Sequence, residues 1–311
     1  MSAAYLNQKA MQTAIGAIAA QEIIAGLQAA IIDASIEILL EIQPATVRAV
    51  CYQLFIRGLI PEMTKQQTDK VSRLLVRARE AGTLPWHWIV DETREAEVTA
   101  SWKSPMEVLQ AAMDQYRKDY WSEQPNHIEI WSEKGTVRGT LAPVLRKYGV
   151  TLRVMHGFSS ATTANDIAGR SLESDKPCIA LYVGDWDPSG MYMSQVDLPD
   201  RVSRYGGKWM IERIAITRTD GRDLPHFDAE TKSKDPRHNW FTEHFGSRCW
   251  ELDAMSPAVL RDRVEHQIRL LLDRDAWQHS LEIEAAERES FTEVQSAIAS
   301  VLTPGAVEGA R

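Results

Sequence analysis

Three carboxylates are the residues of this chain most able to do chemistry. Glu133 follows one short β-rich run, and Asp185 and Asp187 follow another. Residues two apart on an extended segment point to the same side, so these two aspartates share a face and Trp186 points away to packing. Converging carboxylates repel each other unless a cation lies between them. Hard oxygen ligands suit Mg²⁺, which takes one or two carboxylates plus a phosphate. The pattern indicates metal-assisted work on a phosphodiester.

A turn explains the same residues equally well. The segment Asp185-Trp-Asp187-Pro-Ser-Gly190 carries Asp, Pro and Gly at positions that turns favour. An Asp-x-Asp pair alone is a weak signal. From the residues alone, the metal site and the turn both stand.

Alternating strand and helix signals surround these carboxylates. Apolar runs at residues 127–132, 151–155 and 178–183 are separated by helical stretches, the first at residues 136–148, and residues 209–217 are a fourth strand candidate. This alternation predicts βαβ units around a parallel sheet. The side chains that do chemistry in such sheets lie beyond the carboxyl ends of the strands, where all three carboxylates fall.

A second chemical pair lies on a predicted helix. Pro44 ends one helix, and Thr46 suits the N-cap of the next, over residues 47–55. Arg48 and Tyr52 are four apart and share a face of that helix. The guanidinium can neutralise a phosphate oxygen, and the phenol, with a free pKa of about 10, can become a nucleophile once a base or a metal activates it. A tyrosine on a helix is more often packing, and that alternative stays open.

The segment around this pair predicts a helix-turn-helix with a wing over residues 36–90. Residues 57–61 are expected to form a short β-rich connection, and apolar spacing marks a helix after it. Residues 57–94 contain only five acidic side chains but seven basic ones. The basic residues are Arg57, Lys65, Lys70, Arg73, Arg77, Arg79 and Arg94. Such a face can bind phosphates with strong salt dependence, although most charge runs are solvated helix faces.

The composition is that of a globular protein with two domains. The chain has 311 residues, of which 44% are hydrophobic and 25% charged, enough for two cores. Its three cysteines are far apart, which is typical of a reducing compartment without disulfides, so we expect a cytoplasmic, nucleoid-associated protein. The Ala- and Ile-rich opening at residues 14–40 contains acids and amides, which favours amphipathic helices over a membrane span.

The negative charge is concentrated at the C-terminal end. Residues 251–311 hold 6 basic and 12 acidic side chains, a balance of −6, which leaves −2 of the total −8 for the rest. The near-neutral remainder is compatible with a nucleic-acid partner. Apolar residues at helical spacing predict two final helices, the second acidic and amphipathic. The sequence Gly-x-x-x-x-Gly-Lys-Ser/Thr does not occur, so no ATP site is expected in this chain.

Taken together, the two motifs resemble the A subunit of topoisomerase VI and its relatives, including the meiotic double-strand-break transesterase and stand-alone mini-A forms. The motifs are Thr46-Val-Arg-Ala-Val-Cys-Tyr52, then Glu133, then the Asp185 segment quoted above. In that family, a winged-helix domain carries an Arg-x-x-aromatic-Tyr motif, and a Toprim domain carries the Glu and the Asp-x-Asp. Cys51 replaces the usual aromatic residue, a departure that does not touch the chemistry.

The resemblance covers about residues 36–255 and implies a fold class of α/β plus α. The expected parts are an N-terminal helical extension (1–35), a CAP-like winged-helix domain (36–95), a linker helix (96–125), a parallel Toprim domain (126–255) and acidic C-terminal helices (256–311).

The function that the resemblance implies is that of a type IIB topoisomerase A subunit. Tyr52 would attack a backbone phosphorus of double-stranded DNA and form a 5′-phosphotyrosyl link, with Arg48 holding the phosphate. Glu133, Asp185 and Asp187 would bind Mg²⁺, or Mn²⁺ in its place. In that family the tyrosine of one subunit works with the Toprim site of the other, so a homodimer is implied, with a double-strand break as its product. A separate ATPase subunit would be needed for topoisomerase activity, so the chain alone can be inactive.

Two alternatives stay open. The first is a Toprim nuclease that activates a water, with Tyr52 structural, and the second is a DNA-binding module that needs a partner for any activity. Asp91 and Arg94 fit an exposed ion pair or a DNA contact. Glu251 and Asp253 fit a second metal site or a capped strand end, and residues 224–239 are expected to form a loop over the site.

Overall fold

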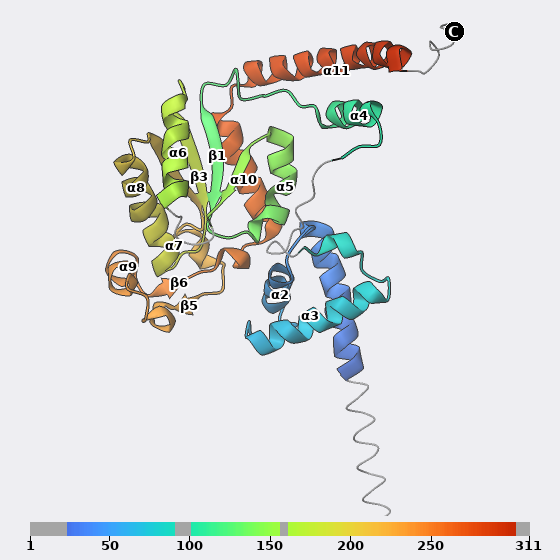
Figure 1. The fold of residues 1–311 in the computed structure, drawn as a ribbon. Helices are drawn as coiled ribbons and strands as arrows, with labels where there is room; N and C mark the ends of the chain where they lie inside the picture. Colours follow the sequence, from blue (N-terminus) through green and yellow to red (C-terminus); the bar gives the residue numbers. More distant parts are fainter. Residues whose placement is uncertain (1–23, 91–100, 156–160, 303–311) are drawn as a thin grey trace, which may run out of the picture.

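The computed structural model describes residues 24–90, 101–155 and 161–302 (Figure 1). Up to residue 90 the chain is helical, with a core of its own between a helix over residues 24–42, α2 (Val47–Ile56) and α3 (Lys65–Glu80). Helix α2 begins as expected, because the Thr46 side chain accepts a hydrogen bond from the Ala49 N–H at 3.2 Å.

The expected β-rich connection is wrong, and residues 36–90 contain no strand. Residues 57–61 form turns in which Gly58 takes a φ of 72°. This left-handed residue lets the Gly58 and Leu59 N–H groups bond back to Phe55 and Leu54, each at 2.9 Å, so the chain reverses without a strand. Over these residues the β pairing is limited to an isolated parallel bridge between Ala45 and Ile89.

The second part of the chain confirms the parallel α/β prediction. Its sheet has the order β2-β1-β3-β4, and every neighbouring pair is parallel. The strands are β1 (His127–Ser132), β2 (Thr151–Val154), β3 (Cys178–Val183) and β4 (Trp209–Ala215). All four carboxyl ends therefore meet at one edge, which faces α2 in Figure 1.

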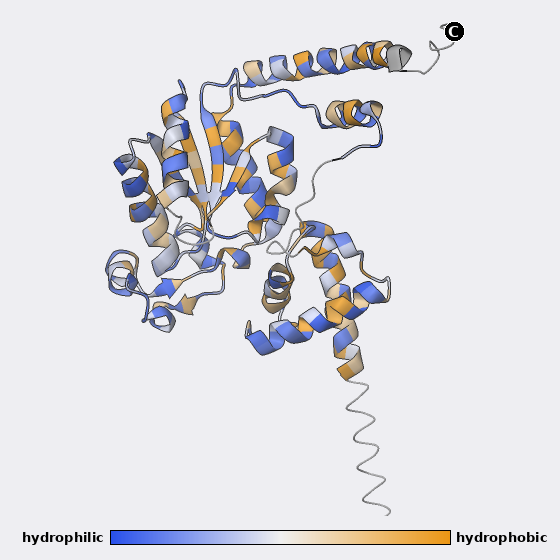
Figure 2. Ribbon diagram, viewed as in Figure 1, coloured by the Kyte–Doolittle hydropathy of each residue, from blue (hydrophilic) through white to orange (hydrophobic). Residues whose placement is uncertain are grey.

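Helices cover both faces of this sheet. One face holds α5 (Val137–Tyr148) and α10 (Pro257–Leu271), and the other holds α6 (Ala161–Glu173) and α8 (Leu198–Arg204) (Figure 1). Strand alternation divides the core between them, since Leu181 belongs to the first cluster and its neighbour Tyr182 to the second. Figure 2 shows the apolar residues gathered on the central strands.

The remaining helices and strands lie around the sheet. They are α4 (Pro105–Gln115), α7 (Pro188–Tyr192), a π-helix (Met193–Asp197), β5 (Phe227–Asp228), α9 (His238–Phe245), β6 (Arg248–Cys249) and α11 (Arg274–Leu302). The loop expected at residues 224–239 is only partly irregular, because β5 pairs antiparallel with β6 and a 3-10 helix (Ala229–Lys232) follows. The two final helices, α10 and α11, are confirmed.

Helices α4 and α11 form an arm at the sheet edge opposite to α2 (Figure 1). The linker helix begins at the Ser104 cap and ends at Gln115, shorter than expected, because the following residues bind α11 instead. For example, the Lys118 N–H donates to Glu284 at 3.1 Å. In the part of the chain that the structure describes, none of these helices has the length and apolar character that crossing a bilayer requires.

Candidate functional site

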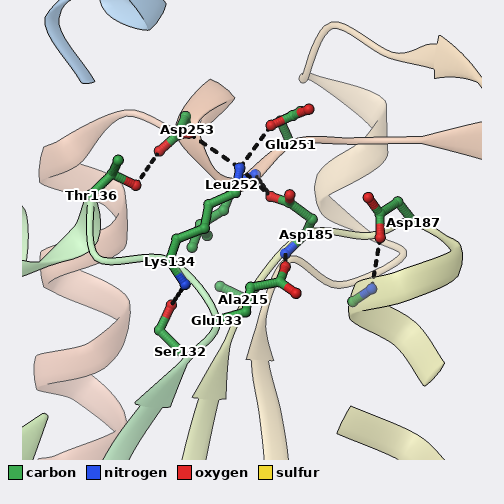
Figure 3. A network of polar contacts seen from close by, with 12 residues as sticks. Ser132, Glu133, Lys134, Thr136, Asp185, Asp187, Ala215, Glu251, Leu252 and Asp253 are labelled. Atoms are coloured by element: carbon green, nitrogen blue, oxygen red, sulfur yellow. Dashed lines mark hydrogen bonds and ion pairs between the residues drawn. The ribbon is translucent and has the colours of Figure 1, made fainter. Parts of the chain in front are cut away.

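The carboxyl edge of the sheet brings the three predicted carboxylates together (Figure 3). Glu133 follows β1, and its Oε1 accepts a hydrogen bond from the Asp185 N–H, after β3, at 3.0 Å. Gly190 allows this approach, since a Cβ there would lie 2.4 Å from the Asp185 carbonyl oxygen and 3.0 Å from Oε1 of Glu133. Trp186 points away from the carboxylates and is buried against Phe245 and Trp250, as predicted.

Lys134 lies at the centre of a larger acidic cluster than the sequence indicated. Its Nζ is 2.8 Å from Asp185, 2.7 Å from Glu251 and 3.2 Å from Asp253 (Figure 3). Asp185 also accepts the backbone N–H of Leu252 at 2.7 Å. Glu251 and Asp253, which sequence reasoning left undecided, therefore belong to the site.

Asp187 makes two interactions, neither of them with the Lys134 cluster. Its Oδ1 accepts the Gly190 N–H at 2.7 Å and so caps α7, which is the turn-forming role that the sequence left open. Its Oδ2 pairs with the ammonium of Lys232, from the 3-10 helix above the site. Asp187 is thus a structural cap and a buried charge at once.

The two lysines stand where the sequence predicted a metal ion. In the described residues, no group of three or more Asp, Glu, His or Cys side chains is arranged to hold one. Oxygens of Asp185, Glu251 and Asp253 nevertheless converge on one point, the Lys134 Nζ, and such hard oxygen donors suit Mg²⁺. These three oxygens could serve as ligands only if the ammonium withdrew. The predicted set of Glu133, Asp185 and Asp187 is not arranged around one point among the described residues, because Asp187 pairs with Lys232 instead.

Arg213 supports the site from beneath. Its guanidinium donates to the carbonyls of Gly184 at 2.9 Å and Gly190 at 2.7 Å, and to the Ser194 hydroxyl at 2.9 Å. These bonds fix the chain on both sides of Asp185 and Asp187. Burial lowers the pKa of Arg213, while the nearby acidic groups oppose that shift.

Burial and like charge raise the pKa of two of the carboxylates. Burial raises the pKa of Glu133, and the Asp187 charge raises it further. Burial also raises the pKa of Asp185 to about 8, although Lys134 opposes this. For Lys134, burial favours the neutral amine, but Asp185, Asp253 and Glu251 outweigh it and hold the pKa above its usual range. The ammonium is therefore charged and tightly held.

Tyr52 reaches this cluster from the helical domain of the same chain. Helix α2 packs on the 3-10 helix Leu252–Ala254, where the Gln53 side chain donates to the Asp253 carbonyl at 3.0 Å. Tyr52 is only 8% exposed. Burial raises its pKa above the usual range, and the charge of Glu251 adds to this shift. Arg48 is exposed, one turn earlier on α2.

Sequence reasoning missed three residues of the site, and two predicted ones cannot be placed. Lys134 directly follows Glu133 in the sequence, and Lys232 lies within the loop expected over residues 224–239, so both positions offered a signal. Arg213 lies within an ordinary strand, where no pattern marks it. Asp91 and Arg94 lie outside the described residues.

The fold and site define an α/β protein whose parallel sheet gathers five acidic residues and two lysines around its carboxyl edge. A comparison with known protein families, with curated proteins and with solved structures finds no match.

Proposed function

We propose that this chain cleaves duplex DNA by transesterification through Tyr52, in the manner of a topoisomerase VI A subunit. The observation that carries the proposal is the contact between α2 and the carboxyl edge, made by Gln53 and Asp253. It brings the two motifs to one place, with the Tyr52 phenol close enough to Asp185 and Lys134 for their charges to act on it.

The reaction follows from these positions. Oη of Tyr52 attacks the phosphorus, an Oη–P bond forms, and the bond from phosphorus to the 3′ oxygen breaks. The phenolic proton passes to a carboxylate of the cluster, and the leaving 3′ oxygen takes a proton from solvent. The products are a 5′-phosphotyrosyl link and a 3′ hydroxyl. Arg48, exposed on the same helix, holds the phosphate.

Glu133, Asp185 and Asp187 would hold Mg²⁺, or Mn²⁺ in its place. The bound ion would neutralise the charge that develops on the phosphate. Lys134 and Lys232 neutralise two of these carboxylates in the structure. The oxygens of an incoming DNA phosphate can accept hydrogen bonds from both ammonium groups. The lysines would then release the carboxylates, so that substrate and ion can enter together.

The partners follow from the same resemblance. Two copies would place two tyrosines across a duplex and produce a double-strand break. A separate ATPase subunit would couple cleavage to strand passage, since this sequence has no Gly-x-x-x-x-Gly-Lys-Ser/Thr loop.

The test is a covalent adduct. Purified protein is incubated with supercoiled plasmid and Mg²⁺ or Mn²⁺, quenched with detergent and assayed for protein bound to DNA ends. We expect an adduct with the wild type, none with Tyr52→Phe, and a normal yield with Tyr205→Phe, which removes a hydroxyl beyond α8. Cleavage that survives Tyr52→Phe and leaves free ends would contradict the proposal.

Two observations favour other functions for the same site. The burial and raised pKa of Tyr52 favour a nuclease that activates a water instead. The lysines in the cation positions favour a DNA-binding module that needs a partner. Mg²⁺-dependent cleavage that disappears in Asp187→Ala would exclude the binding module, and the state of the DNA ends separates the two enzymes.

A further inference from the structure

A pocket of about 360 Å³ lies beside the acidic cluster, and the proposed reaction does not use it. Its walls include Trp186 and Trp250, which flank the carboxylates in sequence. The two tryptophans exchange backbone hydrogen bonds, each 2.9 Å long, in an isolated antiparallel bridge. Because side chains alternate on extended chain, the carboxylates occupy one side of this bridge and the two indoles the other.

Three arginines line this pocket and give it a positive charge. Arg218, Arg222 and Arg248 are all exposed, and none forms an ion pair within the part of the chain that the structure describes. Asp220, two residues after Arg218, is occupied, since Arg263 holds both of its oxygens at 2.6 and 2.7 Å. Unpaired guanidinium groups around one hollow are suited to an anion with several oxygens.

The aromatic wall adds donors that lack an acceptor. The indole N–H groups of Trp186 and Trp250 are buried and have no hydrogen-bond partner among the described residues. Leaving a buried donor unpaired costs about 1–3 kcal/mol, so a ligand that supplies an acceptor is favoured. Phe245 packs edge-on against Trp186, with ring centroids 5.4 Å apart, and completes an apolar floor.

We infer that this pocket binds a backbone phosphate of the DNA strand whose neighbouring phosphodiester lies at the acidic cluster. The inference rests on the proposed function. The three arginines hold the phosphate oxygens, and the backbone bridge between Trp186 and Trp250 connects the pocket rigidly to Asp185 and Asp187. The pocket thereby sets where along the strand the reaction falls.

The test measures binding without metal, so that it does not depend on cleavage. The affinity of the full chain for a short fluorescein-labelled duplex is measured by anisotropy in EDTA at several salt concentrations. The triple variant Arg218→Gln, Arg222→Gln, Arg248→Gln should bind more weakly. The magnitude of the slope of log K against log salt should fall by about 0.9, because the pocket neutralises one phosphate. Arg269→Gln, an exposed change on α10, is the matched control and should bind as the wild type does.

Other outcomes overturn the inference. An unchanged affinity and slope in the triple variant would show that no DNA phosphate occupies the pocket. Inorganic phosphate that protects the wild type but not the triple variant from thermal unfolding, with DNA binding unaltered, would assign the pocket to free phosphate. A full yield of covalent adduct from the triple variant would overturn the pocket and leave the proposed function standing.

Discussion

Lys134 compensates three carboxylates that would otherwise repel each other in a buried site. Each of its contacts with Asp185, Glu251 and Asp253 is 3.2 Å or shorter. Removing one partner of a buried ion network lowers the free energy of unfolding by more than the intact network contributes, because the remaining charges are buried without a counter-ion. This single side chain therefore controls both the stability of the site and its capacity for a metal ion.

We expect Lys134→Met to lower the free energy of unfolding by about 3–5 kcal/mol, because the buried Asp185 and the partly buried Glu251 and Asp253 lose their cation. Thermal unfolding with and without Mg²⁺ measures this. Since a ligand of the native state stabilises it, Mg²⁺ should recover part of the loss. Lys147→Met is the control, because Lys147 is 59% exposed and its pair with Glu265 is worth less than about 1 kcal/mol. A Lys134→Met protein that ignores Mg²⁺ would show that these oxygens hold no ion.

The buried Glu129, which lies outside the site, should make the free energy of unfolding depend on pH. It is fully buried, with Trp131 donating at 2.7 Å and Arg153 at 2.8 and 2.9 Å. Burial alone would raise its pKa, but hydrogen bonds from His127 and Arg153 outweigh this and lower the pKa to about 2. Because the folded value lies below the unfolded one, of about 4.3, the carboxylate stabilises the protein above that pH. This stability is lost as the pH falls towards the folded value.

In Glu129→Gln this contribution disappears. The free energy of unfolding should differ from that of the wild type by on the order of 3 kcal/mol at neutral pH, and the difference should shrink between about pH 4 and pH 2. Urea unfolding at a series of pH values measures it. Glu173→Gln, at the exposed end of α6, should match the wild type throughout. A difference that stays constant with pH would contradict the assignment.

At the scale of elements, the sequence predicted what depends on local periodicity. Strands β1 and β3 have the expected bounds and helix α2 is one residue longer than expected, since apolar spacing and caps are local signals. The connection after α2 failed because Gly58 can take a left-handed turn, which no pattern in an apolar run reveals.

The site was predictable in part for the same reason. The carboxylates that end strands were found, since the edge of a parallel sheet follows from strand order. The lysines that neutralise them were not, because Lys232 reaches Asp187 across the fold from a segment with no regular spacing. Likewise, only the folded chain shows that Tyr52 meets its own cluster.

Gly139 controls how closely the helical domain approaches the sheet. A Cβ at this position in α5 would lie 1.9 Å from the carbonyl oxygen of Pro44 and 2.4 Å from that of Ile42. Gly139→Ala should therefore force the domains apart and lower the free energy of unfolding by about 1–3 kcal/mol. Proteolysis at residues 43–46, followed with thermal unfolding, should become faster.

The matched control is Gly169→Ala in α6, where a Cβ meets nothing within 4 Å. That change should raise stability by about 0.4–1 kcal/mol, because alanine restricts the unfolded chain. Equal effects of the two substitutions would mean that the contact at Gly139 does not hold the domains together.

The whole molecule separates its charges. Helix α2 and the β5–β6 pair lie beyond one edge of the sheet, and the α4–α11 arm lies at the other (Figure 1). The arm carries much of the acidic excess of residues 251–311, where 12 acidic residues face 6 basic ones. A DNA duplex, the proposed substrate, would be repelled by such a helix and would approach from the edge that carries the site.

Because α2 packs against the sheet domain of its own chain, the structure also predicts how many chains are needed to cleave one DNA strand. Tyr52 and the Lys134 cluster belong to a single polypeptide, joined through Gln53 and Asp253. A nick would then be an intramolecular event of first order in protein, and a second chain would add only the opposite strand. A protomer that lacks the tyrosine could not be rescued by one that lacks the carboxylates. Each chain would therefore carry a complete site, and two chains would not have to share one.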